Sequence, residues 1–311
     1  LHVPCVWHGR GTFYPSALNK PDPRLASSVA SGKDRLEYLI ERAHSMGIQV
    51  HPWFTVALRE GGEFPQFAEP GTPEGKYNIH DAKFRAFMHG VMMDVVKRYK
   101  VDGVNLDYVR TGGFCLSEAC IEDYRKKFDR SLRMDLLLRK IPRMQIDSLG
   151  KWNQESVNEI VKNFAQEAKR LRPDLVISVD ASPAKAGSEM QGQSSITWAN
   201  HGWVDVIYNM DYGRELDLER GLRARAALRQ PEKLVMMVAL YDMEAGKPVS
   251  RNPIQLIEYI EFSRKHFPGT GIAFYHLPRL SDEQVQGLQK RPFRVAKRAL
   301  SGLDAEPRRP Q

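Results

Sequence analysis

The chain has 311 residues, a length that suits one α/β barrel of ordinary size, although two smaller domains would also fit. Its hydrophobic content of 42% is enough for a large core and excludes a disordered protein. The formal net charge of +8 raises the question of nucleic acid. There is no recognised binding motif and no interleaving of aromatic with basic residues, so we expect no nucleic-acid partner.

Neither a membrane span nor an export signal is visible. No stretch stays apolar over the roughly 18 residues that a span needs, and no basic-then-apolar signal peptide is present. The chain starts at Leu1 rather than at Met, so we expect a mature form or a fragment. The three cysteines, Cys5, Cys115 and Cys120, do not make a disulfide framework. Cys115 and Cys120 could form a bridge within one loop, but two free thiols are the expected state.

Strand-like and helix-like segments alternate along the chain. Strands are expected at 1–6, 48–56, 101–107, 175–181, 204–210, 234–240 and 271–275, and helices at 33–46, 81–99, 117–128 and 152–171. This alternation predicts parallel strands joined by crossover helices. About seven strands are counted where a closed barrel has eight, so the sequence predicts a TIM-type (β/α)8 barrel whose first β/α unit is missing or lies upstream of Leu1. A doubly wound open sheet is the competing architecture, but no glycine-rich phosphate loop follows an early strand.

The order of these segments predicts one catalytic barrel domain over residues 1–295. A basic and irregular insertion is expected near residues 129–151, and a basic tail at 296–311 should be disordered.

The stretch 101–110, VDGVNLDYVR, organises the candidate site. Its apolar and β-branched residues are typical of a parallel strand buried on both faces, and Asp107 stands where that strand ends. In a parallel barrel that end carries the chemistry, because the loops there leave side chains free to face a ligand. The structural alternative is that Asp107 caps a helix or pairs with Arg110.

Other polar and aromatic residues also follow predicted strands, and a barrel would bring them to the same rim. They are Trp7, His8, Arg10, His51, Trp53, Tyr108, Arg110, Asp180, Asn209, Asp211, Tyr212, Tyr241, Asp242, Tyr275 and His276. Carboxylates with aromatic platforms suit a sugar, because rings stack on apolar sugar faces and paired carboxyl groups can divide the roles of glycosidic cleavage. A carboxyl group beside another one holds its proton more tightly, which can make it an acid near neutral pH.

Two other reaction classes have less support. A metal-dependent barrel could use His8, His51, Asp180 and His276, but no closely spaced histidine pair is present, so we expect no metal and no other cofactor. Nucleophilic serine chemistry lacks its Gly-x-Ser-x-Gly elbow.

Several of these stretches together resemble a known family. They are the loop ending Phe13-Tyr14-Pro15-Ser16, the strand with His51-x-Trp53-Phe54, the stretch Asp102-Gly103-Val104-Asn105-Leu106-Asp107-Tyr108-Val109-Arg110, and Val204-Asp205 leading to Met210-Asp211-Tyr212. In order and spacing they are similar to the family-10-like glycosyl hydrolases of bacteria, in the subgroup with Asp-Tyr-Ile-Arg at the central position. Chitinase-like barrels carry a proton-donating Glu where this chain has Val109, so chitinase activity by that mechanism is not expected.

The resemblance implies a (β/α)8 barrel with glycosidase or glycosidase-like activity. It also implies action on a bacterial polysaccharide outside the cytoplasm, as a periplasmic, secreted or lipid-anchored protein. Amino-sugar polymers, including peptide-free peptidoglycan strands, are the substrates that it suggests.

Our hypothesis from the sequence gives Asp107 the essential catalytic role, with Asp211 as its partner and Asp180 in reserve. Arg110 would position Asp107, and Tyr212 would hydrogen-bond the reacting carboxylate or the sugar. Trp7, Trp53, Tyr241 and Tyr275 would stack on sugar rings, while His8 and His51 would bind hydroxyl groups. Two alternatives stay open, a carbohydrate-binding barrel without catalysis and the metal-dependent hydrolase. The sequence predicts no oligomeric state.

Overall fold

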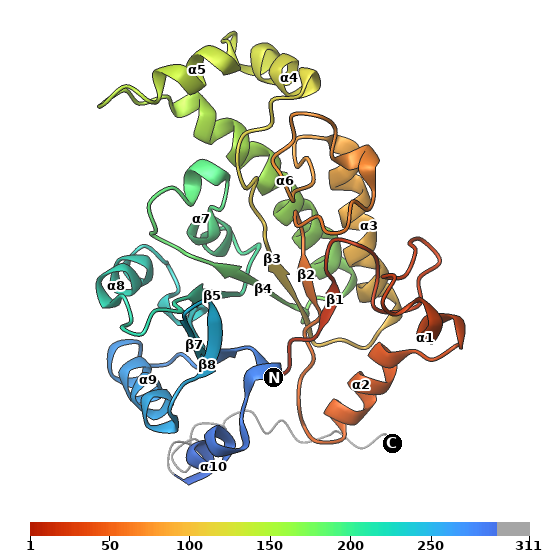
Figure 1. The fold of residues 1–311 in the computed structure, drawn as a ribbon, viewed down its shortest axis with the longest axis vertical. Helices are drawn as coiled ribbons and strands as arrows, with labels where there is room; N and C mark the ends of the chain where they lie inside the picture. The colour runs from red at the N-terminus through yellow and green to blue at the C-terminus, as the bar shows by residue number, and fades with distance from the viewer. Residues whose placement is uncertain (291–311) are drawn as a thin grey trace.

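The computed structural model describes residues 1–290, in which seven parallel strands form one curved sheet with helices packed around it (Figure 1). The strands are β1 (Cys5–Trp7), β2 (Trp53–Thr55), β3 (Gly103–Asp107), β4 (Val176–Ala181), β5 (Val206–Met210), β6 (Leu234–Ala239) and β9 (Ile272–Tyr275). They lie side by side in chain order, and all six pairings are parallel. The predicted α/β architecture with seven parallel strands is therefore confirmed.

The sheet is a partly closed barrel. Within residues 1–290, β1 and β9 are its two edges and do not pair with each other. An eighth strand from outside this sequence stays a prediction, and the expected disordered tail at 296–311 lies outside the described residues.

Ten α-helices occur in the described residues. They are α1 (Ala26–Ala30), α2 (Arg35–His44), α3 (Ala82–Arg98), α4 (Glu118–Phe128), α5 (Leu132–Leu138), α6 (Asp147–Leu171), α7 (Ser195–Asn200), α8 (Leu218–Ala226), α9 (Pro253–His266) and α10 (Asp282–Lys290). Short 3-10 turns lie at Pro65–Phe67, Glu189–Gln191, Pro231–Lys233 and Leu277–Arg279. No helix among residues 1–290 combines the length and the apolar character that crossing a bilayer requires.

Helix α3 illustrates why these segments fold as they do. The Asp81 side chain caps it by accepting a hydrogen bond from the Lys83 N–H. Phe84, Val91 and Val95 recur at helical spacing and are fully buried against the sheet. Basic residues in the last turn complement the helix dipole, so sequence and packing agree along its whole length.

Two details differ from the sequence prediction. The segment near 129–151 is not irregular throughout, because it contains α5 and the first turn of α6. With α4 these helices form a projection beside the barrel, built around its own small core with Trp152 and Tyr124 (Figure 1). An antiparallel hairpin of β7 (Tyr241–Glu244) and β8 (Lys247–Ser250) follows β6 and was not predicted. Tyr241 and Asp242, which were predicted to follow the end of a barrel strand, lie in this hairpin.

Candidate active site

Asp107 and Asp180 lie next to each other on the central strands. The register pairs Leu106 of β3 with Val179 of β4, so the residues that follow them are Asp107 and Asp180. Side chains alternate along a strand, so Asn105 and Asp107 point to the same face. The Asn105 amide donates a hydrogen bond to Asp180 Oδ1 at 3.0 Å, which shows that both strands direct these polar groups into the barrel interior.

Burial dominates the electrostatics of this pair. Only 6% of Asp107 and 8% of Asp180 is exposed, and loss of solvent raises the pKa of both carboxyl groups. The pKa of Asp180 is raised well above its ordinary value, because the charge of Asp107 adds to the effect of burial.

Asp107 has neighbours that favour its ionised form. Burial is the largest influence on its pKa, and it is partly offset by the Tyr108 backbone N–H and by the positive charge of Arg110. The Tyr108 N–H donates to Asp107 Oδ1 at 2.6 Å. Asp107 forms no direct ion pair with Arg110 within residues 1–290, so the guanidinium acts at longer range. The two carboxyl groups therefore titrate as a coupled pair, and the Tyr108 N–H and the charge of Arg110 favour ionisation of Asp107.

Trp53, the first residue of β2, lies beside Asp107. Its indole N–H lowers the pKa of Asp107, yet the buried Nε1 atom makes no hydrogen bond of ordinary geometry within the described residues. A donor so placed is available to a ligand oxygen that binds between the indole and the carboxylate.

Tyrosine rings line the other side of the pair. Tyr208 pairs with Asp180 in the sheet, and burial together with the Asp180 charge raises its pKa to about 12. Tyr212 and Tyr275 stack with their ring centres 5.2 Å apart, and burial raises the pKa of Tyr275 to about 12. The Tyr241 hydroxyl and the two carboxyl groups contribute to that shift, which places Tyr241 near the same site. His276 contacts the Tyr241 ring edge-on at 5.9 Å.

His8 and Arg10 stand on the β1 side of the rim. The His8 ring lies edge-on to Trp53 at 5.8 Å, and its Nδ1 is 3.1 Å from Glu60 Oε2. Arg10 forms ion pairs with the buried Asp22 and with Glu60. Glu60, which lies in the loop beyond the predicted strand 48–56, was not predicted as a site residue.

Two predicted acidic residues have structural partners instead. Asp211 Oδ2 accepts a hydrogen bond from the Asp217 N–H at 2.8 Å and lies 3.3 Å from the Arg220 guanidinium. Asp242 forms an ion pair at 2.8 Å with Arg251, whose side chain is fully buried. Asp211 is thus paired with a cation from α8. The geometry favours Asp180, the reserve candidate, as the partner.

Three other predicted site residues do not face the carboxyl pair. Trp7 is fully buried and packs against Phe64 and Phe87 on the helix side of the sheet. Asn209 is also buried on that side, where its amide contacts the Met236 sulfur at 3.3 Å.

His51 precedes β2 and lies at the entry end of the sheet, where its N–H donates to the His2 carbonyl at 2.9 Å. Burial lowers the pKa of its imidazole to about 4. His8, His51, Asp180 and His276 are therefore not gathered as a set of metal ligands.

Asn105, Ser178 and Tyr208 belong to the site but were not predicted as site residues. Asn105 and Ser178 stand two positions before Asp107 and Asp180, so the two-residue period of a strand puts them on the same face. This two-residue period was the sequence signal that could have predicted Asn105 and Ser178 as site residues. Tyr208 could be found only from the register between β4 and β5.

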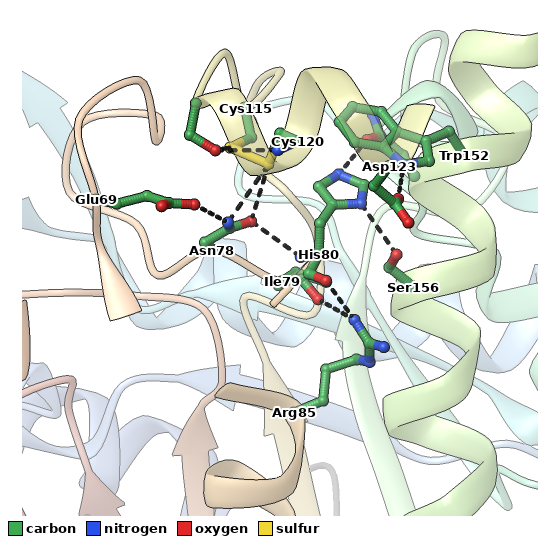
Figure 2. The surroundings of a disulfide bond; sticks show 12 residues. Glu69, Asn78, Ile79, His80, Arg85, Cys115, Cys120, Asp123, Trp152 and Ser156 are labelled. Atoms are coloured by element: carbon green, nitrogen blue, oxygen red, sulfur yellow. Dashed lines mark hydrogen bonds between the residues drawn. A yellow bond between two sulfur atoms is a disulfide. The ribbon is translucent and has the colours of Figure 1, made fainter. Parts of the chain in front are cut away.

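A disulfide joins Cys115 and Cys120 behind the β3 loop, where two free thiols were expected (Figure 2). The Asn78 amide donates to Cys120 Sγ at 3.4 Å and to Glu69 Oε1 at 3.2 Å. Within residues 1–290, Glu69 and these two cysteines are the one group of three potential metal ligands found close together, and the disulfide occupies both sulfurs. The bridge thus joins the loop after β3 to the first turn of α4, and the Asn78 hydrogen bond ties this point to the segment that holds Asn78.

The parallel half-barrel with a buried carboxyl pair at its rim is a fold of the TIM-barrel type. Its fold is similar to α-L-fucosidase isoenzyme 2 from Paenibacillus thiaminolyticus, with a TM-score of 0.68 and 16% identity, over 98% of this chain and 44% of the fucosidase. The chain thus spans less than half the length of that relative. It also resembles the PgaB (BpsB) glycoside hydrolase domain from Bordetella bronchiseptica, with a TM-score of 0.54, 12% identity and coverage of 83% and 76%.

Residues 76–250 match the family described as glycosyl hydrolase-like 10, and the chain belongs to that family. The family inferred from the sequence is therefore confirmed, and the match includes the central stretch 102–110 and the stretch 204–212. No curated protein matched the chain.

Proposed function

We propose that the chain is a glycoside hydrolase in which Asp107 and Asp180 are the reacting carboxyl groups. The observation that supports this most directly is a buried pair of acids on neighbouring strands, with the Tyr108 N–H and Arg110, which favour an ionised carboxylate, beside Asp107. The family and the barrel fold agree with this chemistry.

Cleavage of a glycosidic bond needs a proton for the leaving oxygen and a negative charge near the anomeric carbon. In our proposal Asp180 donates its proton to the glycosidic oxygen, and the bond from that oxygen to the anomeric carbon breaks. Ionised Asp107 then stabilises the positive charge on that carbon or directs water to it. Arg110 and the Tyr108 N–H keep Asp107 ionised while its neighbour remains protonated.

The aromatic groups supply the sugar-binding surface. The stacked Tyr212 and Tyr275 rings offer a flat apolar face, and 38% of Tyr212 remains exposed. Trp53 offers a free N–H beside Asp107. These groups suit a pyranose ring held over the carboxyl pair.

We further propose a bacterial polysaccharide of the amino-sugar class as the substrate and an extracytoplasmic site of action. The Cys115–Cys120 disulfide supports the second point, because disulfides persist in oxidising compartments and are rare in the cytosol. Neighbouring folds are named for action on fucosides and as a glycoside hydrolase domain, which supports a glycan substrate.

The test uses Asp107→Asn, Asp180→Asn and, as a matched control, Asp211→Asn. Release of reducing ends is measured on a panel of bacterial glycans, and each variant is checked by circular dichroism. We expect the first two to lose about 10²–10⁴-fold in kcat/KM, as removal of a general acid or an essential charge does, while the control keeps activity within a few-fold.

Near-normal turnover by Asp107→Asn would remove the proposal. Binding of a glycan by the unmodified protein without any cleavage would instead favour the non-catalytic carbohydrate-binding barrel.

A further inference from the structure

Two cations meet at one aromatic ring directly beside the carboxyl pair. Tyr108 is the first residue after β3, and the Arg110 guanidinium carbon lies 4.7 Å from the centre of its ring. The Lys76 Nζ atom lies 5.2 Å from the same ring centre, although Lys76 is far away in the sequence. The Tyr108 backbone is anchored to Asp107, so this cationic group is tied to the site.

Neither cation has an acidic partner. Within residues 1–290, neither Lys76 nor Arg110 forms an ion pair with a carboxylate. Glu60, an acidic group near Tyr108, is engaged by His8 and Arg10. Other cations around the rim do have partners, as Arg220 has Asp211 and Arg251 has Asp242.

The lysine is held in place rather than extended into solvent. Its stem packs on Gly112, where an added Cβ would come within 2.6 Å of Lys76 Cε. Gly112 also has a φ of 68°, a conformation that other residues rarely adopt. Burial lowers the pKa of Lys76, and the positive charge of Arg110 adds to this effect. Two like charges therefore repel each other in partly buried surroundings, and a bound anion would reduce this repulsion.

We propose that Lys76 and Arg110 form a subsite for an anionic substituent of the glycan, so that the substrate class is an acidic polysaccharide. This inference rests on the proposed function, because it places the anion next to the sugar that Asp107 and Asp180 would cleave. The planar guanidinium of Arg110 matches a carboxylate or a sulfate with two parallel hydrogen bonds, and Lys76 adds a point charge.

The experiment measures binding by calorimetry on the Asp180→Asn protein, which keeps oligosaccharides intact. The probes are hexuronate-containing oligosaccharides, the same compounds after reduction of their carboxyl groups, and neutral oligosaccharides bearing one sulfate ester. We expect the acidic probes to bind at least about 10-fold more tightly than their neutral counterparts, with a preference that shrinks as salt is raised. The carboxylate and sulfate series together identify which anion is preferred.

Variants then assign the preference to the two residues. Lys76→Met and Arg110→Met should each remove most of it, and Arg110→Lys should restore part. Lys162→Met, which removes an exposed charge from α6, is the matched control and should keep the preference. Thermal unfolding checks that every variant is folded.

Equal binding of acidic and neutral probes, binding of neither, or an unchanged preference in both Met variants would overturn the inference. Hydrolysis of a neutral glycan without any preference for acidic probes would support the proposed hydrolase function and contradict the anion subsite. Selective binding of acidic probes with no hydrolysis by the unmodified protein would support the subsite and remove the hydrolase proposal.

Discussion

Replacing Asp242 by Ala tests whether this residue is a sugar ligand, as the sequence suggested, or a structural partner. Its carboxylate accepts hydrogen bonds from Arg251 Nε at 2.9 Å and lies 2.8 Å from Nη2. The Arg251 side chain is fully buried, and its Nη2 also donates to the carbonyl groups of Tyr212 and Gly213 at 2.7 and 3.1 Å. The ion pair therefore fastens the β7–β8 hairpin to the loop that carries Tyr212.

Removing one partner of a buried ion pair costs about 3–5 kcal/mol, because the other charge is left without compensation. Asp242 keeps 19% of its side chain exposed and Arg251 retains its two carbonyl acceptors, so the lower end, about 3 kcal/mol, is expected for Asp242→Ala. Urea unfolding at neutral pH measures this loss as a lower midpoint with an unchanged slope. The corresponding fall in Tm is roughly 6–10 °C.

Glu244→Ala provides the control, since it removes an exposed carboxylate from the same strand and should change stability by less than about 0.5 kcal/mol. The double variant Asp242→Ala with Arg251→Met should be less destabilised than the sum of its two single changes, because it leaves no unpaired charge. A loss below about 1 kcal/mol for Asp242→Ala, together with a raised KM for a responding glycan, would refute this reasoning and restore the role as a sugar ligand.

The remaining predictions concern pH and the disulfide. Activity should fall as the pH rises through the raised pKa of Asp180, because the acid loses its proton there, and the pH profile of Asp180→Asn should lack this limb. The pKa of His51 is about 4 in the folded protein, whereas its ordinary value is 6.5. Between pH 6.5 and pH 4, His51 therefore binds a proton only in the unfolded chain, so the stability of the fold decreases as the pH drops through this range. Urea unfolding at pH 7 and pH 4.5 should show this loss, up to about 3 kcal/mol, and a pH dependence just as steep in His51→Gln would contradict it. Replacing Cys115 and Cys120 by Ser should cost about 2 kcal/mol in the same assay, as expected for a short closed loop, and unfolding identical with and without the bridge would disprove it.

The pattern of apolar residues was enough to predict the architecture and to place Asp107 at the end of its strand. Alternating apolar segments gave all seven parallel strands, because a strand buried on both faces needs a continuous apolar run and a crossover helix needs a 3.6-residue period. Asp107 could be placed at a strand end for the same reason, since the apolar run stops there. These signals are local, so no knowledge of the neighbours is needed to read them.

Which of the strand-end residues meet follows from the folded chain and could not be predicted from local patterns. Asp180 and Asp211 both follow strand-like runs, yet register brings Asp180 beside Asp107, whereas Arg220 from α8 neutralises Asp211. Trp7 looked equally suited to a sugar, but its strand turns it toward the helices. A shift of one residue in register reverses the face of every side chain, and register depends on packing between segments that are distant in sequence. The pairing of Lys76 with Arg110 at the Tyr108 ring depends on the same long-range packing, so it too appears only in the folded chain.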